Sequence, residues 1–319
     1  MTYYDVFNGD ADGICALQQL RLHRSIDSEL ITGVKRDIQL LKRVKAEEND
    51  HVTVLDISLD KNKKELELLL NRNVKVTYFD HHFAGDIPSH PNFKSFIDTR
   101  SDICTSLLVN EYIQGKYVLW AIVGTFGDNL DKSAELVANS QPLNHKEIRL
   151  LRELGILINY NGYGMTLNEL HILPDALFRE LHPFENPFDY IEQSDSYKLL
   201  RDGYYDDMAK AEVQRPEFQT ENYAIYVLPS EKWASRVSGV FINNLATANP
   251  GRAHAVLTKI EDNDGYRVSV RAPLTTLEGA DELCRQFETG GGRKAAAGIN
   301  LLPGTKYDHF VHQFVDSFK

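Results

Sequence analysis

An acidic residue and two histidines stand together where an apolar run ends, at Asp80, His81 and His82. The run before them, residues 74–79, has the length and the β-branched and aromatic composition of a buried strand. Carboxylate and imidazole groups at a strand end suit metal binding or acid–base chemistry. The triplet alone does not establish a site, because polar residues after a strand are often only a turn.

Three further segments place carboxylates directly after apolar stretches. They are Asp10 and Asp12 after the run 3–7, Asp56 after the run 52–55, and Asp128 after the run 119–126. Because the carboxyl ends of parallel strands converge on one crevice, these side chains and the triplet could share a site. Carboxylate oxygen suits hard divalent ions, and imidazole widens the choice toward manganese. For Asp10 and Asp12 alone, a turn or a helix cap is an equally good explanation; the complete set favours a metal site.

Alternating strand and helix patterns over the first 140 residues indicate how these groups are positioned. The expected strands span residues 3–7, 30–34, 51–55, 74–79 and 93–97. The expected helices span residues 14–24 and 63–70, with shorter ones around residues 40–44 and 107–112. Asp37 and either Ser101 or Asp102 are the predicted N-caps of the two shorter helices. This pattern is typical of a mostly parallel sheet covered by helices.

The pattern becomes mainly helical from about residue 120 to about residue 200, and alternation returns after residue 221. Strands are expected at residues 223–228, 253–260 and 266–270, a turn at 262–265, and helices at 235–247, 277–287 and 307–318. The predicted fold class is α/β with two domains, a larger one with a mostly parallel sheet and helices on both faces and a smaller mixed α/β one. The active site is expected in the cleft. The predicted boundaries are 1–195, a linker at 196–221, and 222–319.

The composition is that of an ordinary globular protein with an acidic charge. Of the 319 residues, 42% are hydrophobic, and the formal net charge is -11. This charge argues against binding of long nucleic acid through a basic surface, but not against a small phosphorylated ligand. No apolar run is long enough to span a bilayer, and the N-terminus lacks the basic region of a signal peptide. Three widely spaced cysteines predict reduced thiols and a cytoplasmic location.

The order of these motifs resembles that of the DHH phosphoesterase family. Segment 9–13, the isolated Asp56, the triplet 80–82 and Asp128 match the four motifs of that family in order. Residues 290–298 resemble the glycine-rich signature of its associated C-terminal domain. Members are typically manganese-dependent phosphoesterases, among them RecJ-like exonucleases, nanoRNA and phosphoadenosine phosphate hydrolases, and enzymes that degrade cyclic or linear dinucleotides. The resemblance therefore implies a manganese-dependent hydrolase.

The resemblance also implies a site for two Mn²⁺ ions, for which Mg²⁺ or Co²⁺ could substitute. One ion would be held by Asp10 and Asp56, and the other by Asp12, Asp56, His81 and Asp128. Many relatives have histidine at the position of Asn8, so its amide is a weaker candidate ligand. Asp80 would orient His81 or lie near the metals, and His82 would approach the substrate phosphate or the leaving oxygen.

Glycines and arginines are the candidates for binding the substrate. They are Gly290, Gly291, Gly292, Arg293 and Arg271 in the second domain, and Arg100 in the first. Backbone amides of a glycine cluster can approach a phosphate, and arginine can bind one through two hydrogen bonds. Relatives usually have histidine in place of Arg293, and Arg271 resembles a phosphate-binding arginine of the family. For Arg100, an ion pair at a helix start is an equally good alternative.

The predicted function is metal-dependent hydrolysis of short linear nucleotides, such as the dinucleotide pGpG or nanoRNA, to mononucleotides. The alternatives are a phosphatase acting on phosphoadenosine phosphate and a non-catalytic regulatory module that binds nucleotides. A pyrophosphatase is disfavoured, because the glycine-rich motif resembles that of the nucleotide-hydrolysing branch. A module that only binds would not need so many carboxylates crowded together. The expected partner is a short nucleotide substrate, with no long duplex DNA and no membrane. The sequence leaves open whether the chain forms a homodimer.

Overall fold

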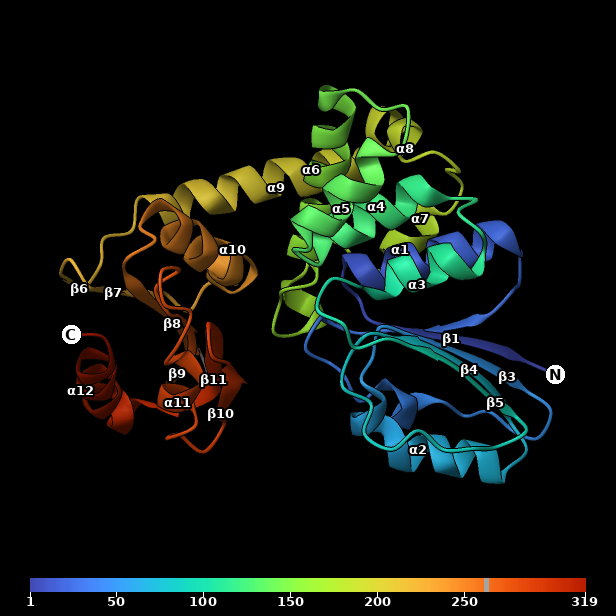
Figure 1. The fold of residues 1–319 in the computed structure, drawn as a ribbon, viewed down its shortest axis with the longest axis horizontal. Helices are drawn as coiled ribbons and strands as arrows, with labels where there is room; N and C mark the ends of the chain where they lie inside the picture. Colours follow the sequence, from blue (N-terminus) through green and yellow to red (C-terminus); the bar gives the residue numbers. More distant parts are fainter. Residues whose placement is uncertain (261–263) are drawn as a thin grey trace. The chain divides into compact units, whose positions relative to one another are not determined.

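The computed structural model describes residues 1–260 and 264–319, and the chain forms two compact units, Met1–Asp202 and Gly203–Lys319. Each unit contains a sheet of its own (Figure 1). The division between the units falls within the helix α9 (Asp195–Glu212). The sequence predicts a linker that begins at residue 196, and the structure has a continuous helix there.

The first unit is built on a five-stranded parallel sheet with helices on both faces (Figure 1). In spatial order its strands are β2 (Glu29–Ile31), β1 (Tyr3–Phe7), β3 (His51–Leu55), β4 (Lys75–Asp80) and β5 (Phe93–Ile97). The helix α2 (Leu59–Asn71) covers one face, and α1 (Ala11–His23) and α3 (Thr105–Tyr112) cover the other. From β1 the chain runs outward to β2 and then returns to β3. That reversal makes the β1/β3 boundary the place where such sheets bind ligands.

Burial on both faces explains why these strands are nearly continuous apolar runs. Val54 and Tyr78 of the sheet are fully buried in one core cluster with Leu66 and Leu70 of α2. The two leucines lie one turn apart on the same side of the helix, which is the spacing of an amphipathic helix on a sheet. Each buried leucine stabilises the unit by about 1.5–3 kcal/mol.

The rest of the first unit is helical, as the sequence predicts. Its helices are α4 (Val118–Gly127), α5 (Asp131–Asn139), α6 (His145–Asn161), α7 (Pro174–Leu181), α8 (Pro187–Gln193) and the first part of α9. Glycines allow α1, α4 and α6 to approach closely, because a Cβ at Gly127 would lie 2.2 Å from the Cβ of Ala11 and 2.8 Å from the carbonyl oxygen of Gly155. This close packing brings the end of α4 to the start of α1.

The second unit has a six-stranded mixed sheet in the order β10-β11-β9-β8-β7-β6. The strands are β6 (Phe218–Gln219), β7 (Tyr223–Leu228), β8 (Ala253–Ile260), β9 (Gly265–Arg271), β10 (Gly290–Arg293) and β11 (Ala296–Pro303). Its helices are α10 (Lys232–Ala248), α11 (Ala280–Cys284) and α12 (Tyr307–Phe318). Phe310 and Phe314 of α12 are fully buried with Val270 of β9 in the core of this unit. The predicted α/β fold class with one parallel and one mixed sheet is confirmed.

Several local predictions are wrong. The expected helix at residues 40–44 is a short 3₁₀ segment (Leu40–Arg43), and Asp37 pairs with Arg43 instead of capping it. The helix expected at residues 277–287 is limited to α11, and the glycine cluster forms the strand β10. Neither Ser101 nor Asp102 caps α3, whose N-cap is Cys104.

One predicted feature falls largely outside the described residues. The turn expected at 262–265 includes two residues outside them, although β8 and β9 on either side pair antiparallel as a hairpin would. Within the described residues, no helix has both the length and the apolar character required to cross a membrane.

Candidate metal centre

The register of the parallel sheet brings three polar strand ends together. Phe7 of β1 pairs with Leu55 of β3, and Leu55 pairs with Phe79 of β4. The residues that follow these positions therefore lie side by side at the carboxyl edge, and they include Asp56 and Asp80. Asp56 has a φ of 59°, a left-handed conformation that is uncommon outside glycine and is often found at active sites.

Asp10 and Asp12 lie at the start of the helix α1, which begins at Ala11 and not at the predicted residue 14. Asp10 is the N-cap and accepts a hydrogen bond from the backbone amide of Gly13 at 3.1 Å. Asp12 is fully buried and accepts hydrogen bonds from the backbone amides of Thr105 and Ser106, both at 2.7 Å. These two amides belong to the first turn of α3 and have no partner within that helix. The Asp12 carboxylate, which comes from α1, accepts their hydrogen bonds in place of the predicted local cap.

His81 is oriented so that one ring nitrogen faces the carboxylates. Its Nδ1 lies 2.9 Å from the carbonyl oxygen of Ile103. A carbonyl only accepts, so Nδ1 carries the proton and Nε2 presents a lone pair. The Nε2 atom lies 3.4 Å from Asp56 Oδ1, 3.6 Å from Asp128 Oδ2 and 3.9 Å from Asp12 Oδ2. The structure thus brings together all four residues predicted for one ion.

Asp80 orients His82, where one of the two predicted alternatives has it orient His81. Its Oδ1 lies 2.7 Å from His82 Nδ1. Residues two apart in an extended chain project to the same side, so Asp80 and His82 meet while His81 faces the other carboxylates. Burial lowers the pKa of His82, but the hydrogen bond and the charge of Asp80, together with the charges of Asp128 and Asp10, outweigh burial and raise this pKa. His82 can therefore hold a proton while 43% of its side chain stays exposed.

The residues present fit a divalent ion at His81. Among the described residues, carboxylate and imidazole atoms close enough to share an ion form two groups, Asp12–His81–Asp128 and Asp56–His81–His82. Three carboxylates and one imidazole form a ligand set of the kind that manganese binds. Asp10 belongs to neither group.

The carboxylates of this site are buried close together, so their negative charges repel one another. Burial, followed by the charges of Asp10, Asp12 and Asp128, raises the pKa of Asp56 well above its ordinary value. Burial likewise raises the pKa of Asp128 to about 6, although Lys35 partly opposes the shift. Buried like charges of this kind are stable as carboxylates only when a cation compensates them.

Lys35 is a residue of this site that the sequence interpretation missed. Its Nζ atom lies 2.5 Å from Asp10 Oδ2, 2.9 Å from Asn159 Oδ1 and 3.7 Å from Asp128 Oδ1. Burial lowers the pKa of Lys35, but Asp10, Tyr163 and Asp128 together more than offset burial, and the net shift is well upward. The signal available was its position directly after the expected strand 30–34, at the same sheet edge as the acidic residues.

The candidate arginines have protein partners. Arg100 binds both carboxylate oxygens of Asp98, at 2.6–3.1 Å, and 67% of its side chain is exposed, which matches the ion-pair alternative. Arg271, at the end of β9, donates through Nε to Asn243 Oδ1 at 2.8 Å. The side chain of Arg271 is thereby held in place before any ligand binds.

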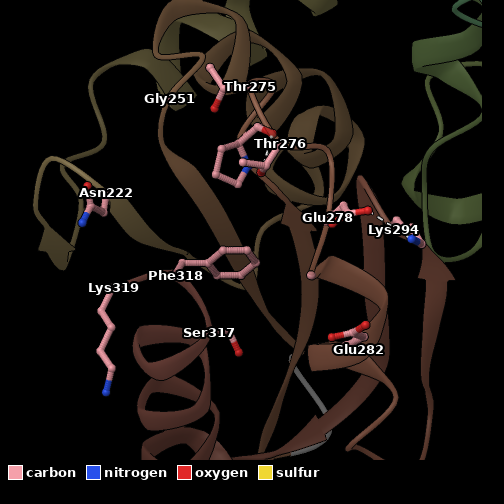
Figure 2. A pocket seen from close by; sticks show the side chains of 12 residues that line it. Asn222, Gly251, Thr275, Thr276, Glu278, Glu282, Lys294, Ser317, Phe318 and Lys319 are labelled. Carbon is pink, nitrogen blue, oxygen red and sulfur yellow. Dashed lines mark hydrogen bonds and ion pairs between the residues drawn. The ribbon is translucent and has the colours of Figure 1, made fainter.

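The glycine cluster is an edge strand with an exposed arginine at its end. Gly290 to Arg293 pair antiparallel with β11, and Gly292 has a φ of 143°. A Cβ at Gly292 would lie 2.5 Å from Cα of Ala297, so close strand approach requires glycine there. The next residue, Lys294, pairs with Glu278 at 3.1 Å in the lining of a cavity of about 470 Å³ within the second unit (Figure 2).

The two units, one with a parallel sheet and one with a mixed sheet, can be compared with known proteins. No family model matches the sequence, and no curated protein does. Solved structures do match. The manganese-bound exonuclease RecJ is 17% identical with a TM-score of 0.65, and the match covers 98% of this chain and 88% of that one.

Two further structures extend this comparison. RecJ from Thermus thermophilus in complex with Mn²⁺ is 18% identical with a TM-score of 0.64; the match covers 100% of this chain but only 52% of that one. The pGpG-specific phosphodiesterase PggH from Vibrio cholerae is 16% identical with a TM-score of 0.57, and the match covers 99% and 100% of the two chains. The resemblance stated from the motifs is confirmed in the fold.

Proposed function

We propose that this chain is a metal-dependent phosphodiesterase that hydrolyses short linear nucleotides, such as pGpG or nanoRNA, to mononucleotides in the cytoplasm. The observation that supports it most is the convergence of Asp12, Asp56 and Asp128 on Nε2 of His81. The fold shared with an exonuclease and a pGpG-specific phosphodiesterase supports the same reaction class. Manganese is the proposed metal, because two of the similar structures contain it.

A metal ion at His81 would polarise a phosphoryl oxygen and lower the pKa of bound water. The residues of the chain supply the remaining functions. His81 and the three carboxylates fix the position of the ion, and Asp80 holds His82 with a proton on the ring. Exposed beside the cluster, His82 can donate that proton to the departing oxygen and so act as a general acid.

A short substrate suits the surroundings of the site better than long nucleic acid. The net charge of -11 disfavours an extended phosphate backbone. Phe83, next to His82, has 74% of its surface exposed and offers a ring on which a base can stack. Arg271 and Arg293 are proposed to bind substrate phosphate, and the backbone of the glycine strand is proposed to assist them.

Hydrolysis of a panel of 5′-phosphorylated dinucleotides, with and without Mn²⁺, tests this proposal. Phosphoadenosine phosphate and a longer single strand are included, and Asp80→Ala is compared with Asp86→Asn, a change at an exposed acid nearby. Mononucleotides released only with metal, fastest from dinucleotides and greatly slowed in Asp80→Ala alone, are expected. Turnover of phosphoadenosine phosphate and of no other substrate would support the alternative that the chain is a phosphatase. Tight binding without turnover would select a regulatory module.

A further inference from the structure

Lys35 lies inside the acidic cluster and is surrounded by oxygen atoms. Its ammonium group contacts Asp10 Oδ2 at 2.5 Å and Asn159 Oδ1 at 2.9 Å, and Asp128 Oδ1 lies 3.7 Å away. An ammonium group donates three hydrogen bonds and accepts none, so it binds oxygen ligands much as a metal ion does. It also lies at the C-terminal turn of α6, where the helix dipole favours a positive charge.

The backbone of Lys35 is fixed on both sides. Its amide donates to the carbonyl oxygen of Gly162 at 2.8 Å, and its carbonyl oxygen accepts from Nδ2 of Asn8 at 3.2 Å. Gly162 ends the same helix that contributes Asn159. The main chain and the side chain of Lys35 are therefore both bound to the C-terminal end of α6. The fold itself thus determines the position of the ammonium group.

The ligands that the resemblance assigns to the first ion are already bound by the chain. Asp10 accepts from Gly13 through Oδ1 and from Lys35 through Oδ2. Asn8 directs its amide nitrogen to Lys35, and its Oδ1 is buried without a hydrogen-bond partner among the described residues. One neutral oxygen beside a carboxylate that already has an ammonium partner is a poor site for a divalent ion. Asp56, the other residue assigned to that ion, contacts Asp10 and also lies 3.4 Å from Nε2 of His81, so it can serve the ion at His81.

From these contacts we infer that the ammonium group of Lys35 replaces one of the two metal ions, so that the centre binds a single divalent ion at His81. The inference rests on the proposed function for the nature of the remaining metal site. It assigns Lys35 a role as the permanent cation on the Asp10 side of the centre. Asn8 then acts as a support for the Lys35 backbone instead of a weak metal ligand.

Counting bound Mn²⁺ tests this inference without measuring turnover. Titration of the full chain, followed by calorimetry and by electron paramagnetic resonance, is expected to give one ion with the spectrum of an isolated Mn²⁺. Lys35→Met removes the charge and keeps most of the bulk. It is expected to bind a second ion at least tenfold more tightly than wild type and to show an exchange-coupled spectrum.

Matched variants separate charge from general damage. Lys35→Arg keeps the charge and Lys64→Met changes an exposed lysine of α2, so both are expected to bind one ion. Asn8→His, with Lys35 intact, is also expected to bind one and remains informative if Lys35→Met does not fold. Two coupled ions in wild type or in Asn8→His, or one ion in folded Lys35→Met, would overturn the inference.

The same data separate this inference from the proposed function. A chain that binds one ion but hydrolyses no nucleotide contradicts the proposed function alone. Two bound ions together with dinucleotide hydrolysis contradict the inference alone. Absence of Mn²⁺ binding contradicts both.

Discussion

The candidate residues of the first unit are buried and held by one another, whereas those of the second unit are more accessible. Asp12 and Asp56 have side chains only 0% and 3% exposed, and both accept hydrogen bonds from Thr105 of α3. Arg293 stands exposed at the end of an edge strand, and Arg271 is partly exposed at the end of β9. The first set is held in place by protein partners, while Arg293 is exposed to solvent.

This difference predicts which kinetic constant each unit controls. Preorganised charges act on the transition state, so their loss should lower kcat or metal affinity. Exposed groups that contact a phosphate equally in the ground and transition states should mainly raise KM. Variants in the two units should therefore separate into these two classes, with the largest effects in the first.

The largest effect is expected for His81→Ala. Removal of the imidazole that faces three carboxylates should weaken Mn²⁺ binding by well over about 100-fold and lower hydrolysis by on the order of 10³-fold. Calorimetric Mn²⁺ titration and dinucleotide turnover measure the two effects. His312→Ala, at an exposed histidine of the second unit, is the control. Unchanged Mn²⁺ affinity in His81→Ala would place the metal elsewhere.

Asp80→Asn should have the next largest effect and should act on catalysis alone. Loss of the carboxylate that raises the pKa of His82 leaves less of the protonated form, so kcat should fall by about 100-fold. Mn²⁺ affinity should stay close to that of wild type. With a p-nitrophenyl phosphodiester, whose leaving group needs no proton, the fall in kcat of this variant should be much smaller. An equal loss with both substrates would refute the general-acid role of His82.

Arg293→Ala tests the second unit. Loss of one charge-assisted contact to phosphate should raise KM by about tenfold and leave kcat within about twofold of wild type. Steady-state kinetics with a 5′-phosphorylated dinucleotide measure both constants. Arg285→Ala, at the exposed arginine that directly follows α11, should change neither. A fall in kcat with constant KM would show that Arg293 acts in the transition state.

His254 should affect stability without affecting activity at neutral pH. This residue of β8 is fully buried, and burial, aided by the charge of Arg252, lowers its pKa to about 4. Because the unfolded state binds a proton near pH 6.5 and the folded state does not, stability should decrease as the pH falls from 6.5 towards 4. The loss should reach about 3 kcal/mol at pH 4.

Thermal unfolding of the full chain between pH 4 and pH 7 measures this effect. His254→Leu replaces the ring with an apolar side chain of similar burial, and it should show a smaller decrease in stability over this pH range. Parallel pH curves for the two proteins would contradict the proposed neutral state of His254. Activity at pH 7 should be the same in both.

Most of the sheet framework could be predicted because it depends on local patterns. The strands at residues 51–55 and 93–97 have the predicted limits, and the long helices lie close to the predicted ranges. The strand β10 was not predicted, because three glycines have no side-chain pattern and only pairing with β11 makes them a strand. The helix start at α3 was misassigned because Asp12, far away in the sequence, takes the role of a local cap.

The candidate site was predictable in its members but not in all of its contacts. Asp12, Asp56, His81 and Asp128 converge as expected. Asp128 follows the helix α4, whereas the sequence pattern suggests that it follows a strand. Glycines that let α1, α4 and α6 pack closely bring it to the site.

The sequence by itself determined that carboxylates and histidines would gather at one edge of a parallel sheet, because strand ends follow from local alternation and parallel strands share an edge. Only the tertiary structure decided which partner each group has. Asp80 contacts His82, and Lys35 binds Asp10 from a segment 25 residues away in the chain. Such pairings depend on strand register and on helix packing, which involve residues far apart in the sequence and leave no local pattern.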